Sequence, residues 1–190
     1  SGWILEGFKS LKSGWTKPGW FDILAGTTVT IILTLLFIVA VKSPVNNNDS
    51  LQYHMSRVMH WVQNRSLQHY ATSFIPQLIH PLWAELAILN IRLLSGMDQF
   101  VNLLQWFSLA GGLVAISAVT KILDRNKAWI WGSIAFALSL PAGILEATST
   151  QNDLVVAFWT ICLLFFIFRG IKTDLQGLDF FMIGSVLGLG

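Results

Sequence analysis

The chain has 190 residues, of which 54% are hydrophobic and 12% are charged, and its mean hydropathy is +0.61. Soluble domains carry about twice that share of charged residues, so the composition excludes a soluble globular domain. The formal net charge of +2 is too small to indicate a nucleic-acid partner, and the single cysteine, Cys162, excludes an internal disulfide.

The beginning of the chain predicts contact with a membrane surface. Tryptophans and lysines occur together over residues 1–20, and tryptophan is enriched at the depth of lipid headgroups. This segment lacks the cleavage pattern of a secretory signal peptide. Because the chain starts at Ser1 and stops at Gly190 inside an apolar run, we expect it to be the N-terminal part of a longer protein.

Five apolar segments follow, and each predicts a membrane span. A helix of about 20 apolar residues crosses a hydrocarbon core of ~30 Å. The segments cover residues 21–41, 100–122, 128–145, 154–168 and 178–190, and we expect the last to be incomplete. The sequence therefore predicts an all-α, polytopic transmembrane fold.

The segment 82–94 decides the topology, because it is apolar but short and contains Glu85 and Arg92. If it crossed the membrane, the basic loop 121–127 would lie opposite the basic N-terminus. If it lies in the interface, eight of the twelve lysines and arginines share one side, as the positive-inside rule requires. These eight are Lys9, Lys12, Lys17, Lys121, Arg125, Lys127, Arg169 and Lys172.

The second arrangement fits better and fixes an orientation. It places the N-terminus in the cytoplasm and makes residues 43–99 one long outer loop. Apolar residues repeat at helical spacing after Asp49, which predicts amphipathic helices lying parallel to the membrane.

Two acidic residues stand at the predicted outer ends of the spans. Asp49 follows the first span and Asp153 begins the fourth, so this topology puts both on the outer face. Carboxylates there are costly, which favours a function such as holding a cation or acting as a base beside a metal. The structural alternative is that each caps a helix, Asp49 together with Gln52.

A polar stripe runs along the first predicted helix of the outer loop. Its members are Tyr53, Arg57, His60 and Asn64. We interpret this stripe as a solvated helix face, because a lone histidine spacing is weak support for a metal site. Arg57 and Arg65 are candidates for binding an outer-leaflet phosphate, since a guanidinium matches phosphate geometry. Contact with ordinary lipid headgroups explains these two arginines equally well.

Two stretches of the chain resemble a known class of membrane enzyme. They are Asp-Ser-Leu-Gln-Tyr-His-Met-Ser-Arg-Val-Met-His-Trp at residues 49–61 and Gln-Asn-Asp-Leu-Val-Val-Ala-Phe-Trp at residues 151–159. The chain resembles, in order from its first to its fifth span, the GT-C-type glycosyltransferases, specifically the bacterial protein-mannosyltransferase-like and aminoarabinose-transferase-like enzymes. That family has a long first outer loop with two membrane-parallel helices and an acidic residue at its start.

The resemblance implies that a sugar moves from a polyprenyl-phosphate-linked donor to a lipid, glycan or protein acceptor. It implies an extracytoplasmic active face on a bacterial inner or plasma membrane. Asp49 and Asp153 take the catalytic positions, with Asp49 near the acceptor as a base or organiser. A divalent cation is left open, and its ligands stay unassigned, because Asn48-Asp49-Ser50 stands where the relatives carry Asp-Glu. The substrate-binding candidates are Tyr53, His54, Arg57, Arg65 and Glu85.

Two other classes of protein compete with this interpretation. A catalytically silent membrane subunit or scaffold of a larger assembly fits the missing second carboxylate beside Asp49. A transporter fits less well, because transporters place their sites near mid-bilayer and these acids lie at helix ends.

Overall fold

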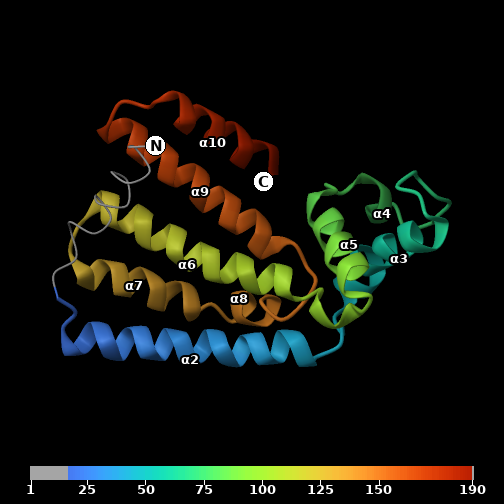
Figure 1. Ribbon diagram of the computed structural model, residues 1–190, viewed down its shortest axis with the longest axis horizontal. Coiled ribbons are helices and arrows are strands. Elements are labelled where there is room, and N and C mark those ends of the chain that lie inside the picture. Colours follow the sequence, from blue (N-terminus) through green and yellow to red (C-terminus); the bar gives the residue numbers. More distant parts are fainter. Residues whose placement is uncertain (1–16, 190) are drawn as a thin grey trace. The chain divides into compact units, whose positions relative to one another are not determined.

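The computed structural model describes residues 17–189, and every regular element in that part of the chain is a helix (Figure 1). Three helical stretches are long and apolar enough to cross a membrane. They are α2 (Trp20–Lys42), Asp98–Leu123, which ends in α6 (Leu103–Leu123), and α9 (Asp153–Lys172). The predicted all-α, polytopic membrane fold is confirmed. The expected interfacial segment over residues 1–20 lies almost wholly outside the described residues.

The chain divides into two compact units, residues 1–34 and 35–190, and the boundary falls within α2. In the first unit, Asp22 Oδ2 accepts a hydrogen bond from Gly19 N at 2.9 Å where α2 begins. Three threonines in this stretch donate their hydroxyls to the carbonyl four residues earlier. These internal bonds satisfy the hydroxyls of Thr28, Thr30 and Thr34 in a largely apolar stretch, as hydrocarbon requires.

In the second unit, α6 and α9 pack side by side, and α7 (Lys127–Leu138) follows α6 as its hairpin partner (Figure 1). The close approach of α6 and α9 depends on Gly111, where a Cβ atom would stand 2.8 Å from Phe158 Cε2. Between α6 and α7, Thr120 Oγ1 donates to Ser133 Oγ at 3.1 Å. The bundle therefore uses one small residue and one hydroxyl pair, which are common helix contacts in membranes.

A salt bridge fixes the turn between α9 and α10 (Gly177–Leu189). Arg169 Nη1 lies 3.1 Å from Asp179 Oδ1, and Asp179 is buried. Asp179 Oδ2 also accepts a hydrogen bond from Gln176 N at 3.0 Å, which caps the start of α10. Nearby, Lys172 Nζ donates to the carbonyl of Ile122 at the end of α6, so both basic residues of the last turn of α9 are held.

The structure differs from the expected third span over residues 128–145. It has two helices there, α7, which ends at Leu138, and the short α8 (Pro141–Glu146). Leu140 is extended, with φ −78° and ψ 111°, because a residue before proline avoids the helical conformation. With 12 residues, α7 is shorter than the roughly 20 that a straight span needs.

The residues between α2 and α6 form what we call the first-loop cluster. Its elements are the π-helix η1 (Ser50–His54), α3 (Met55–Asn64), α4 (Pro76–Ile79), α5 (Trp83–Ser95) and the 3-10 helix η2 (Asp98–Phe100). A small apolar core of Met55, Val58, Ile88 and Val101 joins α3 to α5 and to the start of α6. The helices expected in the outer loop are therefore present, and their placement parallel to a membrane stays a prediction.

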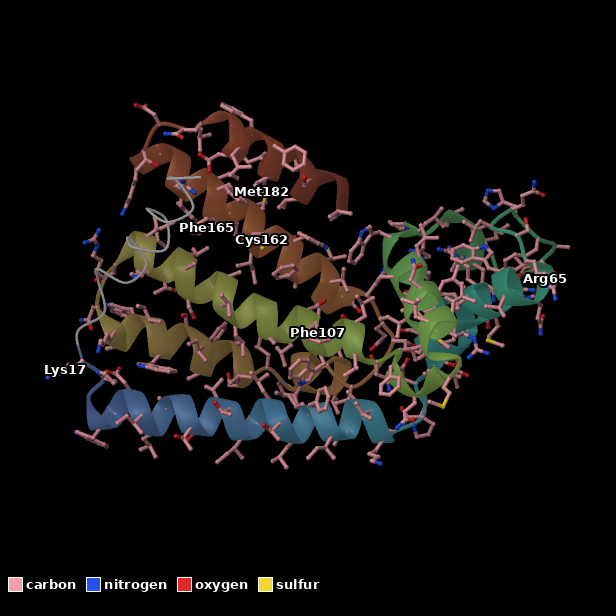
Figure 2. The ribbon with its side chains drawn as sticks, viewed as in Figure 1. Lys17, Arg65, Phe107, Cys162, Phe165 and Met182 are labelled. Carbon is pink, nitrogen blue, oxygen red and sulfur yellow. The ribbon has the colours of Figure 1, made fainter. Side chains whose placement is uncertain are left out.

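Large apolar side chains point outward from the long helices. Figure 2 shows them along α6, α9 and α10, where Phe107 is 60% exposed and Met182 is 41% exposed. In the first-loop cluster, Ile79 and Leu94 are exposed to 71% and 89%. Contiguous apolar surface of this kind is unfavourable in water and favourable in hydrocarbon, so the chain is an integral membrane protein.

Cysteine labelling tests whether α7 and α8 together cross the membrane. After Cys162→Ser, we expect single cysteines at Asn126→Cys and Thr148→Cys to react with a membrane-impermeant maleimide from opposite sides, because one crossing separates the two positions. Intact spheroplasts compared with inverted vesicles give the measurement. Labelling of both positions from one side would overturn the predicted topology.

Paired glycine substitutions test the contact between α6 and α9. Gly111→Ala is expected to lower the free energy of unfolding by about 1–3 kcal/mol, because its Cβ collides with the Phe158 ring. Gly112→Ala is the matched control, since a Cβ there meets no atom within 4 Å of the described structure. The control should gain up to about 1 kcal/mol from helix propensity. Denaturant titration of the purified protein in detergent measures both, and equal effects would contradict the predicted contact.

Candidate functional site

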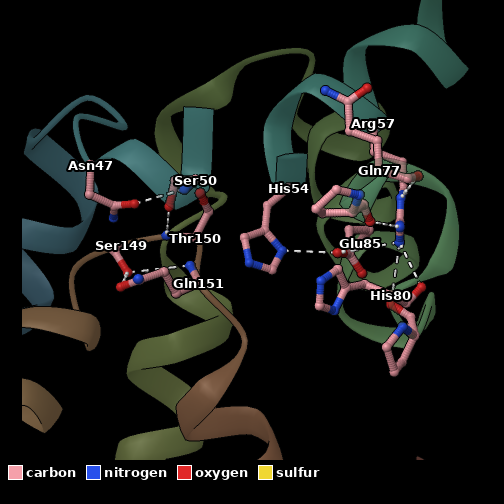
Figure 3. A network of polar contacts seen from close by, with 12 residues as sticks. Asn47, Ser50, His54, Arg57, Gln77, His80, Glu85, Ser149, Thr150 and Gln151 are labelled. Carbon is pink, nitrogen blue, oxygen red and sulfur yellow. Dashed lines mark hydrogen bonds and ion pairs between the residues drawn. The ribbon is translucent and has the colours of Figure 1, made fainter. Parts of the chain in front are cut away.

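The start of the first-loop cluster meets the loop that precedes α9. Gln151 Nε2 donates to Asp49 Oδ2 at 3.2 Å. Thr150 N donates to Ser50 Oγ at 3.3 Å, a contact that Figure 3 shows. Asn47 Oδ1 accepts a hydrogen bond from Ser50 N at 2.8 Å and so fixes the turn that carries Asp49. We call this junction the mouth. The structure thus brings together two segments that the topology placed on one face.

Neither acid at the mouth acts as a helix cap. Asp49 makes no capping hydrogen bond, and Gln52 Nε2 donates to Asn48 Oδ1 rather than completing a capping box with Asp49. Asp153 is the first residue of α9, and its carboxylate is exposed. A helix N-terminus favours a negative charge at that position. Both carboxylates therefore remain accessible to a ligand at the mouth.

Tyr53 links the mouth to the interior of the first-loop cluster. Its ring lies against the ring of His54, with centroids 3.8 Å apart, and stacks on His80 at 5.0 Å. Burial raises the pKa of the Tyr53 hydroxyl, and the negative charges of Asp153, Asp49 and Glu85 raise it further. The hydroxyl therefore stays protonated and can donate to an anionic or polar ligand.

Glu146, at the end of α8, lies within the electrostatic influence of Asp153. Burial raises the pKa of its carboxyl group, and the charge of Asp153 raises it further. Glu146 therefore ionises less readily than a free carboxyl group, and the negative field at the mouth comes from Asp49 and Asp153. Such a field favours a ligand that carries a positive charge or several hydroxyl donors.

A buried group of ionisable side chains lies behind Tyr53. His54 Nδ1 is 2.9 Å from Glu85 Oε1, and Arg57 Nη1 is 3.5 Å from the same oxygen. All three side chains are fully buried. Buried charges persist only when they are paired, so this group joins α3 to α5.

The guanidinium of Arg57 also binds the backbone of the turn around α4. Nε donates to Gln77 O at 2.6 Å and Nη2 to Pro76 O at 2.9 Å, while Nη1 donates to His80 O at 3.1 Å and Pro81 O at 3.3 Å. The sequence predicts that the polar stripe containing Arg57 is a solvated helix face, and this interpretation is wrong for Arg57. The guanidinium is fully buried and makes four bonds to backbone carbonyls, so Arg57 organises the loop and is not exposed to a substrate phosphate.

The remaining candidates lie in different places. Arg65 follows α3 as its left-handed C-cap, with φ 49°, and its side chain is exposed (Figure 2). His60 stacks on Tyr70 with ring centroids 3.9 Å apart, which explains its position without a metal. Among the described residues, no three histidine, cysteine, aspartate or glutamate side chains form a group that could hold a metal ion. The divalent cation stays a prediction.

Three polar residues of this region were not singled out from the sequence. Gln151 and Thr150 form the mouth, and Gln77 connects α4 to η1, since its Nε2 donates to Gln52 O at 2.6 Å. Gln151 could have been found, because it opens the second stretch that resembles the glycosyltransferases. Gln77 carries no such signal, since a single glutamine in an irregular loop is usually solvated.

These elements define a polytopic helical membrane protein whose first loop folds over a buried ionic group beside an acidic mouth. The family model of the DUF1420 N-terminal domain matches residues 8–189, and the chain belongs to this family. No curated protein and no solved structure matches the chain.

Replacing Arg57 tests its structural role. Arg57→Gln is expected to lower the free energy of unfolding by about 3–5 kcal/mol, because Glu85 is left buried without its cation. Arg65→Gln is the control and should change it by less than about 0.5 kcal/mol, since Arg65 is exposed. Denaturant titration monitored by tryptophan fluorescence reports the change, because Trp61 lies under the guanidinium at 5.9 Å. Equal stability of the two variants would contradict the assignment.

Proposed function

We propose that this protein is a membrane glycosyltransferase that moves a sugar from a polyprenyl-phosphate-linked donor to an acceptor on the extracytoplasmic face. The observation that carries the proposal is the hydrogen bond between Asp49 and Gln151. It joins the two stretches, 49–61 and 151–159, that resemble GT-C-type glycosyltransferases. Their meeting at one mouth is what a shared active site requires.

The chemistry assigned to the mouth is modest. A lipid phosphate is a good leaving group, so the enzyme has to orient or deprotonate an acceptor hydroxyl and stabilise the departing phosphate. Asp49 takes the first task as a base or organiser of the acceptor, supported by its exposure and its bond from Gln151. Asp153 is the second acid, and the neutral hydroxyl of Tyr53 is placed to hold a substrate oxygen.

The phosphate needs a positive group, and the chain offers one exposed candidate in the outer loop. Arg65 is exposed, whereas Arg57 is committed to the backbone of the loop. Arg65 therefore takes the proposed phosphate contact, either to the donor or to lipid headgroups at the surface. Glu85 and His54 are fully buried behind Tyr53, so neither is assigned to substrate binding.

The proposed orientation places this chemistry outside the cell. With the N-terminus in the cytoplasm of a bacterial inner or plasma membrane, the basic ends of α6 and α9 face the anionic inner leaflet. The first-loop cluster then lies on the opposite face, where its exposed apolar residues reach the bilayer and a lipid-linked donor.

One observation favours a second function. The ionisable side chains within the first-loop cluster mostly bind one another and the backbone, as a scaffold would require. In that case the protein is a catalytically silent membrane subunit of a larger assembly. Consumption of a donor by the purified full-length protein separates the two functions.

The variant Asp49→Asn tests the proposed reaction. In liposomes containing the full-length protein, we expect release of undecaprenyl phosphate from undecaprenyl-phosphate hexoses or undecaprenyl-phosphate aminoarabinose. The rate of the variant should be at least about 100-fold lower, which is the contribution of an acid–base group, at an unchanged expression level. Asp174→Asn, an exposed carboxylate in the turn after α9, is the matched control and should keep the rate. Turnover that persists in Asp49→Asn would exclude Asp49 from the site.

A further inference from the structure

The buried pair of His54 and Glu85 contains a ring nitrogen that has no role in the chemistry assigned to the mouth. His54 Nδ1 contacts Glu85 Oε1, whereas Nε2 of the same ring is buried and has no hydrogen-bond partner in the described structure. Buried polar atoms are paired in nearly all native proteins. A ring nitrogen that the fold buries and leaves unpaired is therefore a candidate for a reacting or ligand-binding atom.

Charge balance indicates the resting form of this ring. Glu85 faces both His54 and Arg57, so one cation already offsets the carboxylate. A neutral imidazole then leaves the buried group without net charge, which is the least costly arrangement in a low-dielectric interior. In this form Nδ1–H donates to Glu85, and Nε2 carries a free lone pair. A carboxylate that holds Nδ1–H orients an imidazole and stabilises it after it accepts a proton.

The pair lies one helical turn from the mouth. The N–H of Met55 donates to Ser50 O across the π-turn, and Ser50 Oγ accepts the hydrogen bond from Thr150 N. Figure 3 shows His54 between this contact and Glu85. The hydroxyl oxygen of Thr150 is another fully buried atom without a hydrogen-bond partner in the described structure. The mouth and the buried pair thus each contain one buried polar atom without a partner in the described structure.

Tyr53 separates the buried pair from the acids of the mouth. Its ring covers the ring of His54, and the charges that raise the pKa of its hydroxyl come from both sides, from Asp153 and Asp49 at the mouth and from Glu85 inside. Tyr53 is half-buried, and its ring would have to move before His54 could meet a ligand at the mouth.

We propose that His54 accepts the proton of the acceptor hydroxyl and that Glu85 is its positioning residue. This inference rests on the proposed glycosyl transfer. The acceptor oxygen forms the new bond to the anomeric carbon, and the bond from that carbon to the phosphate oxygen breaks, with the electron pair leaving on the lipid phosphate. The proton passes to Nε2 directly or through one water and is later released to solvent. Asp49 then orients the acceptor.

The groups around His54 set how the rate depends on pH. They are Tyr53 and Arg57 from η1 and α3, Glu85 from α5, His80 beside Tyr53, and Asp49 and Asp153 at the mouth. Since only a neutral imidazole can accept a proton, the rate should fall when the medium is acidified.

The decisive variant is His54→Asn in the full-length protein in liposomes. The asparagine amide replaces Nδ1–H and keeps the bond to Glu85, but it has no group in the place of Nε2. We expect release of undecaprenyl phosphate from the donors named above to fall by at least about 100-fold, with the KM for the donor unchanged. His60→Gln, on the same helix but stacked on Tyr70, is the matched control and should keep the rate and the pH profile.

The outcomes separate this inference from the proposed function. No turnover by the wild type would remove both. If Asp49→Asn abolishes turnover while His54→Asn keeps both the rate and the pH profile of the wild type, the role of His54 is overturned and the proposed function stands. If His54→Asn does not fold, the wild-type pH profile decides, and a rate that does not fall on acidification would overturn the proposal. Glu85→Gln should lower kcat and shift the acid limb, as a positioning residue requires.

Discussion

The first-loop cluster depends on one buried guanidinium. Arg57 donates to four backbone carbonyls between residues 76 and 81 and pairs with Glu85, so it holds the one-turn helix α4 and the irregular residues that follow it. An irregular segment can be buried only if its carbonyls find donors. The rigid fork of arginine supplies several donors at the cost of a single charge, and Glu85 balances that charge.

This arrangement has consequences for the neighbouring chemistry. Because Arg57 offsets Glu85, the carboxylate can hold His54 by Nδ1 without leaving a net charge in the interior. η1 then places Ser50 against Thr150 and Asp49 against Gln151, which ties the loop to the start of α9. The acidic mouth therefore depends on the same ion pair that stabilises the loop. A substitution of Arg57 should disturb both the loop and the mouth.

Hydropathy predicted the long helices well, since α2, α6 and α9 are uniformly apolar and their pattern does not depend on partners. It did not predict the division of residues 128–145, although Pro141 marks the break in the sequence. Topology predicted only that Asp49 and the segment before α9 lie on the same face. It did not predict the identity of the contact, because this is made by Gln151 across a separation of 102 residues.

The sequence by itself determined the helical membrane class and the position of the acids at helix ends, because both follow from local composition and the period of the helix. The tertiary structure decided which polar residues are buried. Arg57 and Arg65 are eight positions apart and look equivalent in the sequence, yet the first is fully buried and the second is exposed. The difference arises because α4 and α5 fold over Arg57, and contacts between distant segments leave no periodic trace in the chain.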